Sequence, residues 1–301
     1  MCLYGNLIKN QRYLPNKKNK GNPPACKDKR MKYVPAKCGV CVECMKETAR
    51  EWTIRLLEEL KQKKGIFVTL TFDDEHLKDC QEGKENEFAA KMIELFRKRW
   101  QKKYKKAHKH FFVTERGDDN SERLHIHGIV WTDISEEEYR KIWKYGYIDF
   151  GYKCDESTVA YIVKYIKKID RKHPNFKGKV FASKGIGRAI INRKFLYGNQ
   201  FKGEETKEYY QLPNGAKVGL PKYVRERIWS EEEREFLWAR KLDEKTRYVR
   251  GEKIKIDTEK GVEEYLRCRN YHREMNIRLG YKAGKDHKKY IETLKKINNI
   301  L

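Results

Sequence analysis

Residues 123–131 read RLHIHGIVW, a run in which apolar and polar side chains alternate at its start. Alternation with a period of two predicts a β-strand with one buried face. His125 and His127 then share one face, while Leu124, Ile126 and Val130 point the other way, into a core. Two imidazoles so placed can bind one divalent metal ion. Most such histidine pairs are incidental, so the interpretation depends on what lies beside them.

The preceding segment supplies a carboxylate. Residues 110–116 (HFFVTER) are also typical of a strand, and a polar turn at 117–122 joins the two strands as a hairpin. If residue 115 pairs with residue 125, Glu115 shares a face with both histidines. Two histidines and one carboxylate leave positions open for water and a phosphate oxygen. The sequence therefore predicts a metal site formed by His125, His127 and Glu115.

The order of elements around this hairpin predicts the fold class. Expected helices cover residues 45–63, 87–106, 135–143 and 155–169, and two more strands cover 66–72 and 145–150. From residue 66 onward the order is strand, helix, two strands, helix, strand, helix. That order is typical of an α+β fold with an antiparallel sheet and helices on one face. Outside residues 45–170, an irregular basic arm is expected at 9–37 and helices near 230–238, 261–279 and 286–299.

The helix expected at 155–169 carries two tyrosines. Tyr161 and Tyr165 are four residues apart and share a face, while Ile162, Ile166 and Ile169 have the spacing of a buried stripe. Lys164 and Lys168 lie beside the tyrosines. A phenol is a poor nucleophile at its free pKa of about 10, and nearby ammonium groups would favour the phenolate. The alternative is that both rings only pack on a basic helix.

The charge distribution indicates a polyanionic partner. The chain has 301 residues, 69 Lys and Arg against 44 Asp and Glu, and a formal net charge of +25. Residues 1–44 and 171–301 hold net charges of +8 and +15, whereas residues 45–170 hold +2. Basic flanks around a nearly neutral core suit a phosphate backbone, although the lysines could simply solvate the surface. No stretch approaches the roughly 20 apolar residues of a membrane span, and residues 1–13 lack the apolar segment of a secretory signal.

Eight cysteines are expected to be reduced thiols or metal ligands rather than disulfides. Cys38, Cys41 and Cys44 have the C-x2-C spacing of zinc ligands, with Cys26 as the fourth ligand and Cys2 as an alternative. Such an ion would order residues 1–44. Packed reduced thiols and an iron–sulfur cluster are the other interpretations, the cluster disfavoured because Thr48 stands where its fourth cysteine is expected.

The two motifs together resemble a known family. His125-Ile126-His127 followed by Tyr161-x3-Tyr165 resembles the HUH endonucleases, which include rolling-circle replication initiators and relaxases. The chain is most similar to the replication initiators of gokushoviruses, within the single-stranded DNA microviruses. Further stretches carry this resemblance: MCLY at 1–4, CGVCVECMKETAREW at 38–52, VTLTFDDEHL at 68–77, RLHIHG at 123–128, YIVKYIKK at 161–168, SKGIG at 183–187 and LPKY at 220–223.

The resemblance implies a ferredoxin-like or RRM-like nuclease core at 45–170. It also implies Mg²⁺ or Mn²⁺ on His125 and His127, and Tyr161 and Tyr165 as nucleophiles. One departure is Leu124, where proline is expected in many relatives. The implied reaction nicks a single-stranded DNA origin through a 5′-phosphotyrosine, with Lys164 neutralising developing charge. The freed 3′-hydroxyl would prime a host polymerase, with a host helicase as a further partner, in the cytoplasm of the bacterial host.

Two other functions fit parts of the sequence. One is a non-catalytic single-stranded nucleic-acid-binding protein with an RRM-like sheet, but the aromatic run of RRM readers is missing. The other is a relaxase or transposase of a mobile element, which would use the same chemistry on another DNA. Formation of a covalent protein–DNA adduct separates the enzymes from the binding protein.

Overall fold

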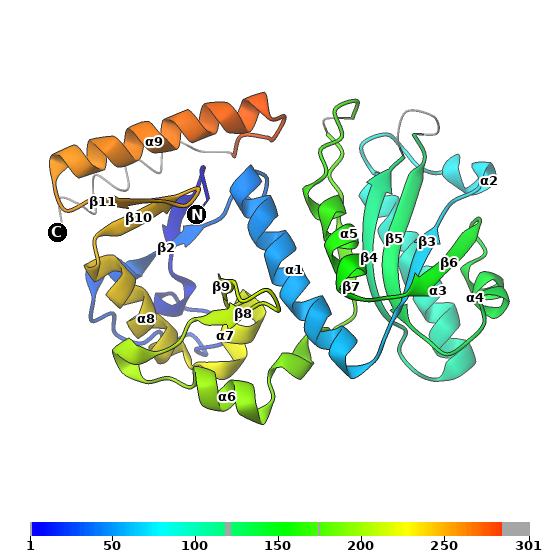
Figure 1. Ribbon diagram of the computed structural model, residues 1–301, viewed down its shortest axis with the longest axis horizontal. Helices are drawn as coiled ribbons and strands as arrows, with labels where there is room; N and C mark the ends of the chain where they lie inside the picture. Colours follow the sequence, from blue (N-terminus) through cyan, green and yellow to red (C-terminus); the bar gives the residue numbers. More distant parts are fainter. Residues whose placement is uncertain (1, 118–121, 174, 285–301) are drawn as a thin grey trace. The chain divides into compact units, whose positions relative to one another are not determined.

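The computed structural model describes residues 2–117, 122–173 and 175–284, and Figure 1 shows its elements in order. These residues form two compact units. One unit draws on residues 1–47, 199–207 and 225–301, and the other on residues 48–198 and 208–224. The first and last segments of the chain thus belong to one unit rather than forming two separate extensions.

A five-stranded antiparallel sheet organises the second unit. Its strands are β3 (Ile66–Leu70), β4 (Lys109–Arg116), β5 (Leu124–Trp131), β6 (Ile148–Lys153) and β7 (Val180–Ala182). Their spatial order is β6-β3-β5-β4-β7, so the central hairpin predicted from the sequence lies in the middle of the sheet. The α+β class is confirmed, and β7 extends the sheet beyond residue 170. The turn expected at 117–122 lies largely outside the described residues.

Helices cover both faces of this sheet, so the expectation of one covered face is wrong (Figure 1). The helices α3 (Glu85–Tyr104) and α4 (Glu136–Trp143) pack on one face. The other face carries α5 (Glu156–Lys167) and the later part of α1 (Val42–Gln62). The difference arises because α1 precedes the first strand of the sheet and returns its apolar side, Leu56, Leu57 and Leu60, to the open face.

Local sequence explains where these helices begin. The Asp155 side chain accepts a hydrogen bond from the Thr158 N–H, and the Thr158 hydroxyl accepts one from the Asp155 N–H, which closes a capping box at the start of α5. Ser135 caps α4 in the predicted position. The strand expected at 145–150 begins later, at Ile148, because Gly146 adopts a φ of 155° in the preceding turn.

The first unit is built from small hairpins and two helices. The strands β1 (Asn6–Lys9) and β2 (Tyr33–Ala36) pair, as do β10 (Thr246–Val249) and β11 (Glu252–Lys255). The helices are α8 (Glu231–Asp243), which opens with the predicted Ser230–Glu233 capping box, and α9 (Glu259–Arg278). The helix expected at 286–299 lies outside the described residues.

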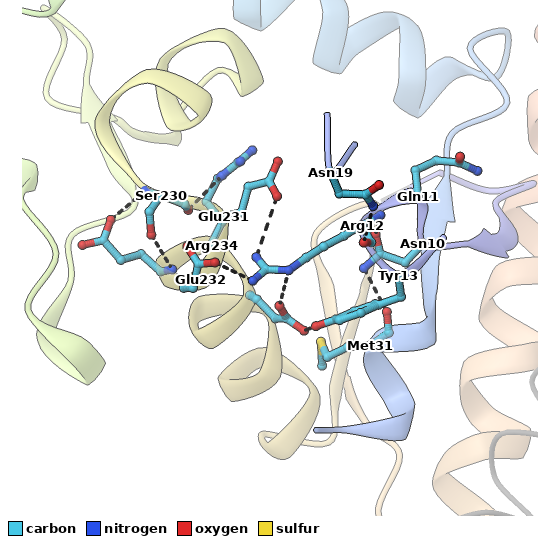
Figure 2. Close-up of polar contacts among 12 residues, drawn as sticks. Asn10, Gln11, Arg12, Tyr13, Asn19, Met31, Ser230, Glu231, Glu232 and Arg234 are labelled. Carbon is cyan, nitrogen blue, oxygen red and sulfur yellow. Dashed lines mark hydrogen bonds and ion pairs between the residues drawn. The ribbon is translucent and has the colours of Figure 1, made fainter. Parts of the chain in front are cut away.

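Residues 9–37 are not the irregular arm that their composition suggests. They include β2 and two short 3-10 helices, Gln11–Tyr13 and Lys29–Lys32. Figure 2 shows Arg12 reaching the carboxylates of α8, with its guanidinium 2.5 Å from Glu232. Tyr13 donates to Glu235, and Arg30 pairs with Asp243. Ion pairs between segments more than 200 residues apart therefore order the arm, and the local sequence does not reveal them.

Smaller elements complete the described chain: α2 (Asp74–Leu77), Arg188–Ile190, α6 (Arg193–Asn199), Gly203–Glu205, β8 (Tyr209–Gln211), β9 (Lys217–Gly219) and α7 (Lys222–Ile228). Within the residues described, no helix combines the length and apolar character needed to cross a bilayer.

Gly128, directly after His127, gives a first prediction. A Cβ at this position would lie 2.2 Å from Cδ1 of Phe112 and 2.7 Å from the Phe111 carbonyl oxygen, so β4 and β5 pair closely only because the side chain is absent. We expect Gly128→Ala to lower the free energy of unfolding by about 1–3 kcal/mol in urea denaturation. Gly198→Ala is the matched control, because no atom lies within 4 Å of its added Cβ in α6. Equal stability of both variants and the parent would contradict the argument.

Candidate functional site

The register of the central hairpin matches the prediction. Glu115 on β4 is the direct partner of His125 on β5, so Glu115, His125 and His127 share one face. Leu124, Ile126 and Val130 are buried in the core on the opposite face. The Glu115 side chain reaches diagonally to His127, whose Nε2 lies 2.6 Å from the carboxylate oxygen. The hairpin therefore brings a buried carboxylate and an imidazole into direct contact.

The His127 ring is held on several sides. Its Nδ1 lies 3.2 Å from the Thr69 hydroxyl of β3, and its face stacks on the Tyr165 ring at 4.5 Å with 13° between planes. Phe67 lies at 6.1 Å on the same sheet face. Since a carboxylate only accepts hydrogen bonds, the neutral ring carries its proton on Nε2, and Nδ1 accepts from Thr69. These contacts fix the direction in which each ring nitrogen points.

Lys168 completes the polar contacts of Glu115. Its ammonium donates to the second carboxylate oxygen. Burial alone would raise the pKa of Glu115, but the hydrogen bonds from His127 and Lys168 outweigh it and hold the pKa below its ordinary value. Glu115 is therefore ionised at neutral pH although its side chain is buried.

His125 stands beside this pair rather than within it. Its ring is parallel to that of His127 within 15°, at a centroid distance of 6.3 Å. Burial, with a smaller contribution from the charge of His127, lowers the pKa of His125, so the ring is neutral at pH 7. The donor atoms of the three predicted ligands do not all lie within 4.8 Å of one another, as those of two other groups in the described residues do. The structure thus places the three on one face, with only Glu115 and His127 in contact.

Both tyrosines of α5 face this cluster. The Tyr165 hydroxyl donates to the Tyr161 hydroxyl at 2.5 Å, and the rings meet edge to face at 5.3 Å. Tyr165 is buried, whereas 39% of Tyr161 is exposed. Lys164 Nζ lies 4.3 Å from the Tyr161 ring centroid and 5.8 Å from that of Tyr165. The pair therefore consists of one buried hydroxyl donor and one accessible acceptor.

Several contacts of this site were not predicted from the sequence. Thr69 and Phe67 contribute from β3, and Lys168 pairs with Glu115 rather than only flanking the tyrosines. The β3–β5 register, which aligns Thr69 with His127, would have revealed the first of these. Ile169 lies beyond the end of α5, so the predicted apolar stripe stops at Ile166.

A cavity of about 160 Å³ lies next to Lys168. It is lined mainly by basic side chains and backbone from the end of β4 and the segment after α5: Arg116, Gly117, Lys168, Ile169, Asp170, Arg171, Lys172 and His173. Positive charge around a hollow of this size suits a phosphate group.

The cysteine cluster lies in the other unit. None of the eight cysteines, all of which the structure describes, forms a disulfide, and Cys38, Cys41 and Cys44 come together as the spacing predicts. Their fourth neighbour is Cys2, whereas the Cys26 thiol donates to the Asp28 carbonyl at 3.0 Å and lies outside the group.

The contacts of Glu115 predict a stability effect. Glu115→Gln keeps the shape of the side chain but removes the charge that His127 and Lys168 share. We expect the free energy of unfolding of the metal-free protein to fall by about 1–3 kcal/mol, measured by chemical denaturation. Glu122→Gln is the control, because that carboxylate is solvent-exposed and pairs with the exposed Lys172, and its stability should match the parent. A stable Glu115→Gln variant would mean that the buried contacts contribute nothing.

Known proteins place this site in a family. Residues 65–170 match the family model of the replication-associated proteins ORF2 and gene 2 protein. The chain is also similar to the replication-associated protein VP4 of the Bdellovibrio phage phiMH2K, with 28% identity over 214 residues. That match covers 63% of this chain and 66% of the phage protein, just under two thirds of the relative's length. No solved structure matches.

The segment that matches the family model begins just before β3 and ends just after α5. It therefore contains every residue of the histidine and tyrosine cluster. Through residues 65–170, the chain belongs with the replication-associated proteins of this family, which include a protein of a phage.

Proposed function

We propose that this protein starts rolling-circle replication by metal-dependent nicking and rejoining of single-stranded DNA through a 5′-phosphotyrosine. The observation that carries the proposal is the stacking of Tyr165 on His127, with the Tyr161 hydroxyl hydrogen-bonded to that of Tyr165. A potential nucleophile and potential metal ligands thus converge on one side of one sheet. The replication-associated family to which the segment belongs fits this reaction.

The residues fit a divalent cation. His125 and His127 offer imidazole nitrogens, and Glu115 offers an ionised carboxylate that already lies against His127. Nitrogen and oxygen donors of this kind suit Mg²⁺ or Mn²⁺, which would draw electron density from a non-bridging phosphate oxygen. Binding through Nε2 requires the His127 proton to sit on Nδ1 instead, where the Thr69 oxygen can accept its hydrogen bond.

The hydroxyl pair suits nucleophilic attack. Tyr161 is the accessible member, and the hydrogen bond from Tyr165 together with the charge of Lys164 would stabilise its phenolate. The Tyr161 oxygen would attack the phosphorus in line. A bond from this oxygen to phosphorus forms, the bond from phosphorus to the 3′ oxygen breaks, and the leaving oxygen takes up one proton for the one lost by the phenol.

The second tyrosine gives the reaction a return step. With Tyr161 esterified, a small shift of α5 side chains would bring Tyr165 to the next phosphate, so that the new 3′-hydroxyl can release the first ester and close a circle. The basic cavity beside Lys168 would hold a neighbouring phosphate of the strand. A host polymerase would extend the freed 3′-hydroxyl while a host helicase opens the duplex, in the cytoplasm of the host.

One observation favours a second candidate, a non-catalytic single-stranded nucleic-acid-binding protein. Tyr152 on β6 is 54% exposed and stacks on Phe67 at 5.9 Å, on the same face as the histidines. An exposed ring on a sheet is a platform for an unpaired base. The same ring would serve the nuclease by holding a base near the scissile phosphate, so the two functions separate only by chemistry.

Tyrosine variants test the nucleophile. We expect Tyr161→Phe and Tyr165→Phe each to retain some covalent adduct on an origin-containing oligonucleotide and the double variant to form none, since phenylalanine keeps the ring and removes the oxygen. Denaturing gels followed by peptide mapping of the linked protein give the answer. Tyr152→Phe is the control and should form adduct like the parent. An adduct on a tyrosine other than 161 or 165 would refute the assignment, and no adduct at all with intact binding would favour the second candidate.

Histidine variants test the metal. We expect His125→Ala and His127→Ala to lose cleavage while binding of single-stranded DNA changes little, because binding draws on dispersed cations and cleavage needs a polarised phosphate. Cleavage with and without EDTA, and DNA affinity by fluorescence anisotropy, separate the two effects. Undiminished cleavage in EDTA would exclude a metal-dependent reaction.

A further inference from the structure

Four cysteine thiols of the first unit converge on a single point. Cys2 lies before β1, Cys38 and Cys41 lie before α1, and Cys44 lies in the first turn of that helix. All four sulfurs lie within 4.8 Å of one another, and the pairs Cys2–Cys41 and Cys38–Cys44 are both 3.9 Å apart. Four sulfurs at about 2.3 Å from one tetrahedral ion stand about 3.8 Å apart. The cluster therefore has the dimensions of a coordination shell around one ion.

The backbone supports thiolates at this point. The Cys38 N–H donates to the Cys2 sulfur at 3.3 Å, and the Cys41 N–H donates to the Cys38 sulfur at 3.4 Å. Gly39, with a φ of 74°, allows the chain to turn back over the sulfur of Cys38. Donors aimed at sulfur favour the charged form and orient it, as the outer contacts of metal ligands do.

The surroundings are closed and apolar. Cys41 and Cys44 are buried beside Leu3, Val42 and Tyr265. Asn276 of α9 accepts from the Val42 N–H at 2.8 Å, which fixes the start of α1 beside the sulfurs. A Cβ on Gly284 would lie 2.6 Å from the Cys38 Cβ, so the segment after α9 packs directly over the cluster. A closed site of this kind suits a structural ion rather than a catalytic one.

The geometry also separates this interpretation from its alternatives. The sulfurs are nearly twice as far apart as the roughly 2 Å of a disulfide. An iron–sulfur cluster would place several irons and sulfides between the thiolates and so would need them farther apart. A soft, all-sulfur, tetrahedral set is the one that zinc prefers.

We propose that Cys2, Cys38, Cys41 and Cys44 bind one structural Zn²⁺ that ties the segment before β1 to α1. Cys26, which the sequence motif favours as the fourth ligand, takes no part. Because the four ligands come from segments with few regular elements, the free energy of zinc binding contributes directly to the folding of this unit. The site is independent of the proposed nuclease reaction.

A matched pair of variants tests the ligand set. The full-length chain, purified under reducing conditions, should contain about one zinc per chain by mass spectrometry of the metal. Cys26→Ser should keep this content, and Cys2→Ser should bind zinc roughly tenfold or more weakly in a chelator competition. Cys268→Ser is a further control, since Cys268 lies with Glu252 and His272 in the other donor group of the described residues. Zinc loss from Cys26→Ser or Cys268→Ser, with retention by Cys2→Ser, would overturn the assignment.

A measurement on the unmodified protein guards against variants that fail to fold. Replacement of zinc by Co²⁺ should give the thiolate-to-cobalt charge-transfer absorption and the strong visible bands of a tetrahedral sulfur site. Bound zinc should protect Cys2, Cys38, Cys41 and Cys44 from alkylation, as mapped by peptide mass spectrometry, and a chelator should remove the protection and lower the Tm. Equal alkylation of these four thiols with and without zinc, or iron as the bound metal, would refute the proposal.

Discussion

The pairing of β4 with β5 is the constraint on which the candidate site depends. Side chains on a strand alternate between faces, so a slip of one residue would send His125 and His127 into the core and expose Ile126 and Val130. The apolar positions on both strands resist that slip, and the absent side chain at Gly128 lets the Phe112 ring pass close to β5. The chemistry of Glu115 and His127 thus rests on the burial of their neighbours. Packing on one face of the sheet sets the geometry on the other.

Sequence reasoning reached the parts of the site that are local. The strand alternation and the hairpin predicted the pairing of Glu115 with His125, and the helix period predicted that Tyr161 and Tyr165 share a face. The contact of Lys168 with Glu115 could not be predicted, because it depends on how α5 crosses the sheet. The same limit applies to Cys2, which lies 36 residues before its partner Cys38. Proximity in space between distant segments leaves no trace in spacing.

The two tyrosines, equivalent in the sequence, are unequal in the fold. Tyr165 stacks on His127 and is buried in the same apolar cluster as Phe67, whereas Tyr161 reaches the surface and accepts the hydrogen bond of its neighbour. Only the position of α5 over the sheet distinguishes them. A pair of like residues one helical turn apart can therefore differ in protonation and access without any difference in their local sequence.

The contacts of the amino-terminal arm change the meaning of the net charge. Arg12 and Arg30 are counted among the cations of residues 1–44, yet each faces carboxylates of α8, as Figure 2 shows for Arg12. A cation already paired within the protein displaces no counterions from a nucleic acid unless that pair first breaks. The dependence of DNA affinity on salt concentration will therefore be less steep than the formal charge of this segment implies. Part of its basic character holds the arm to α8 and is not available to a phosphate backbone.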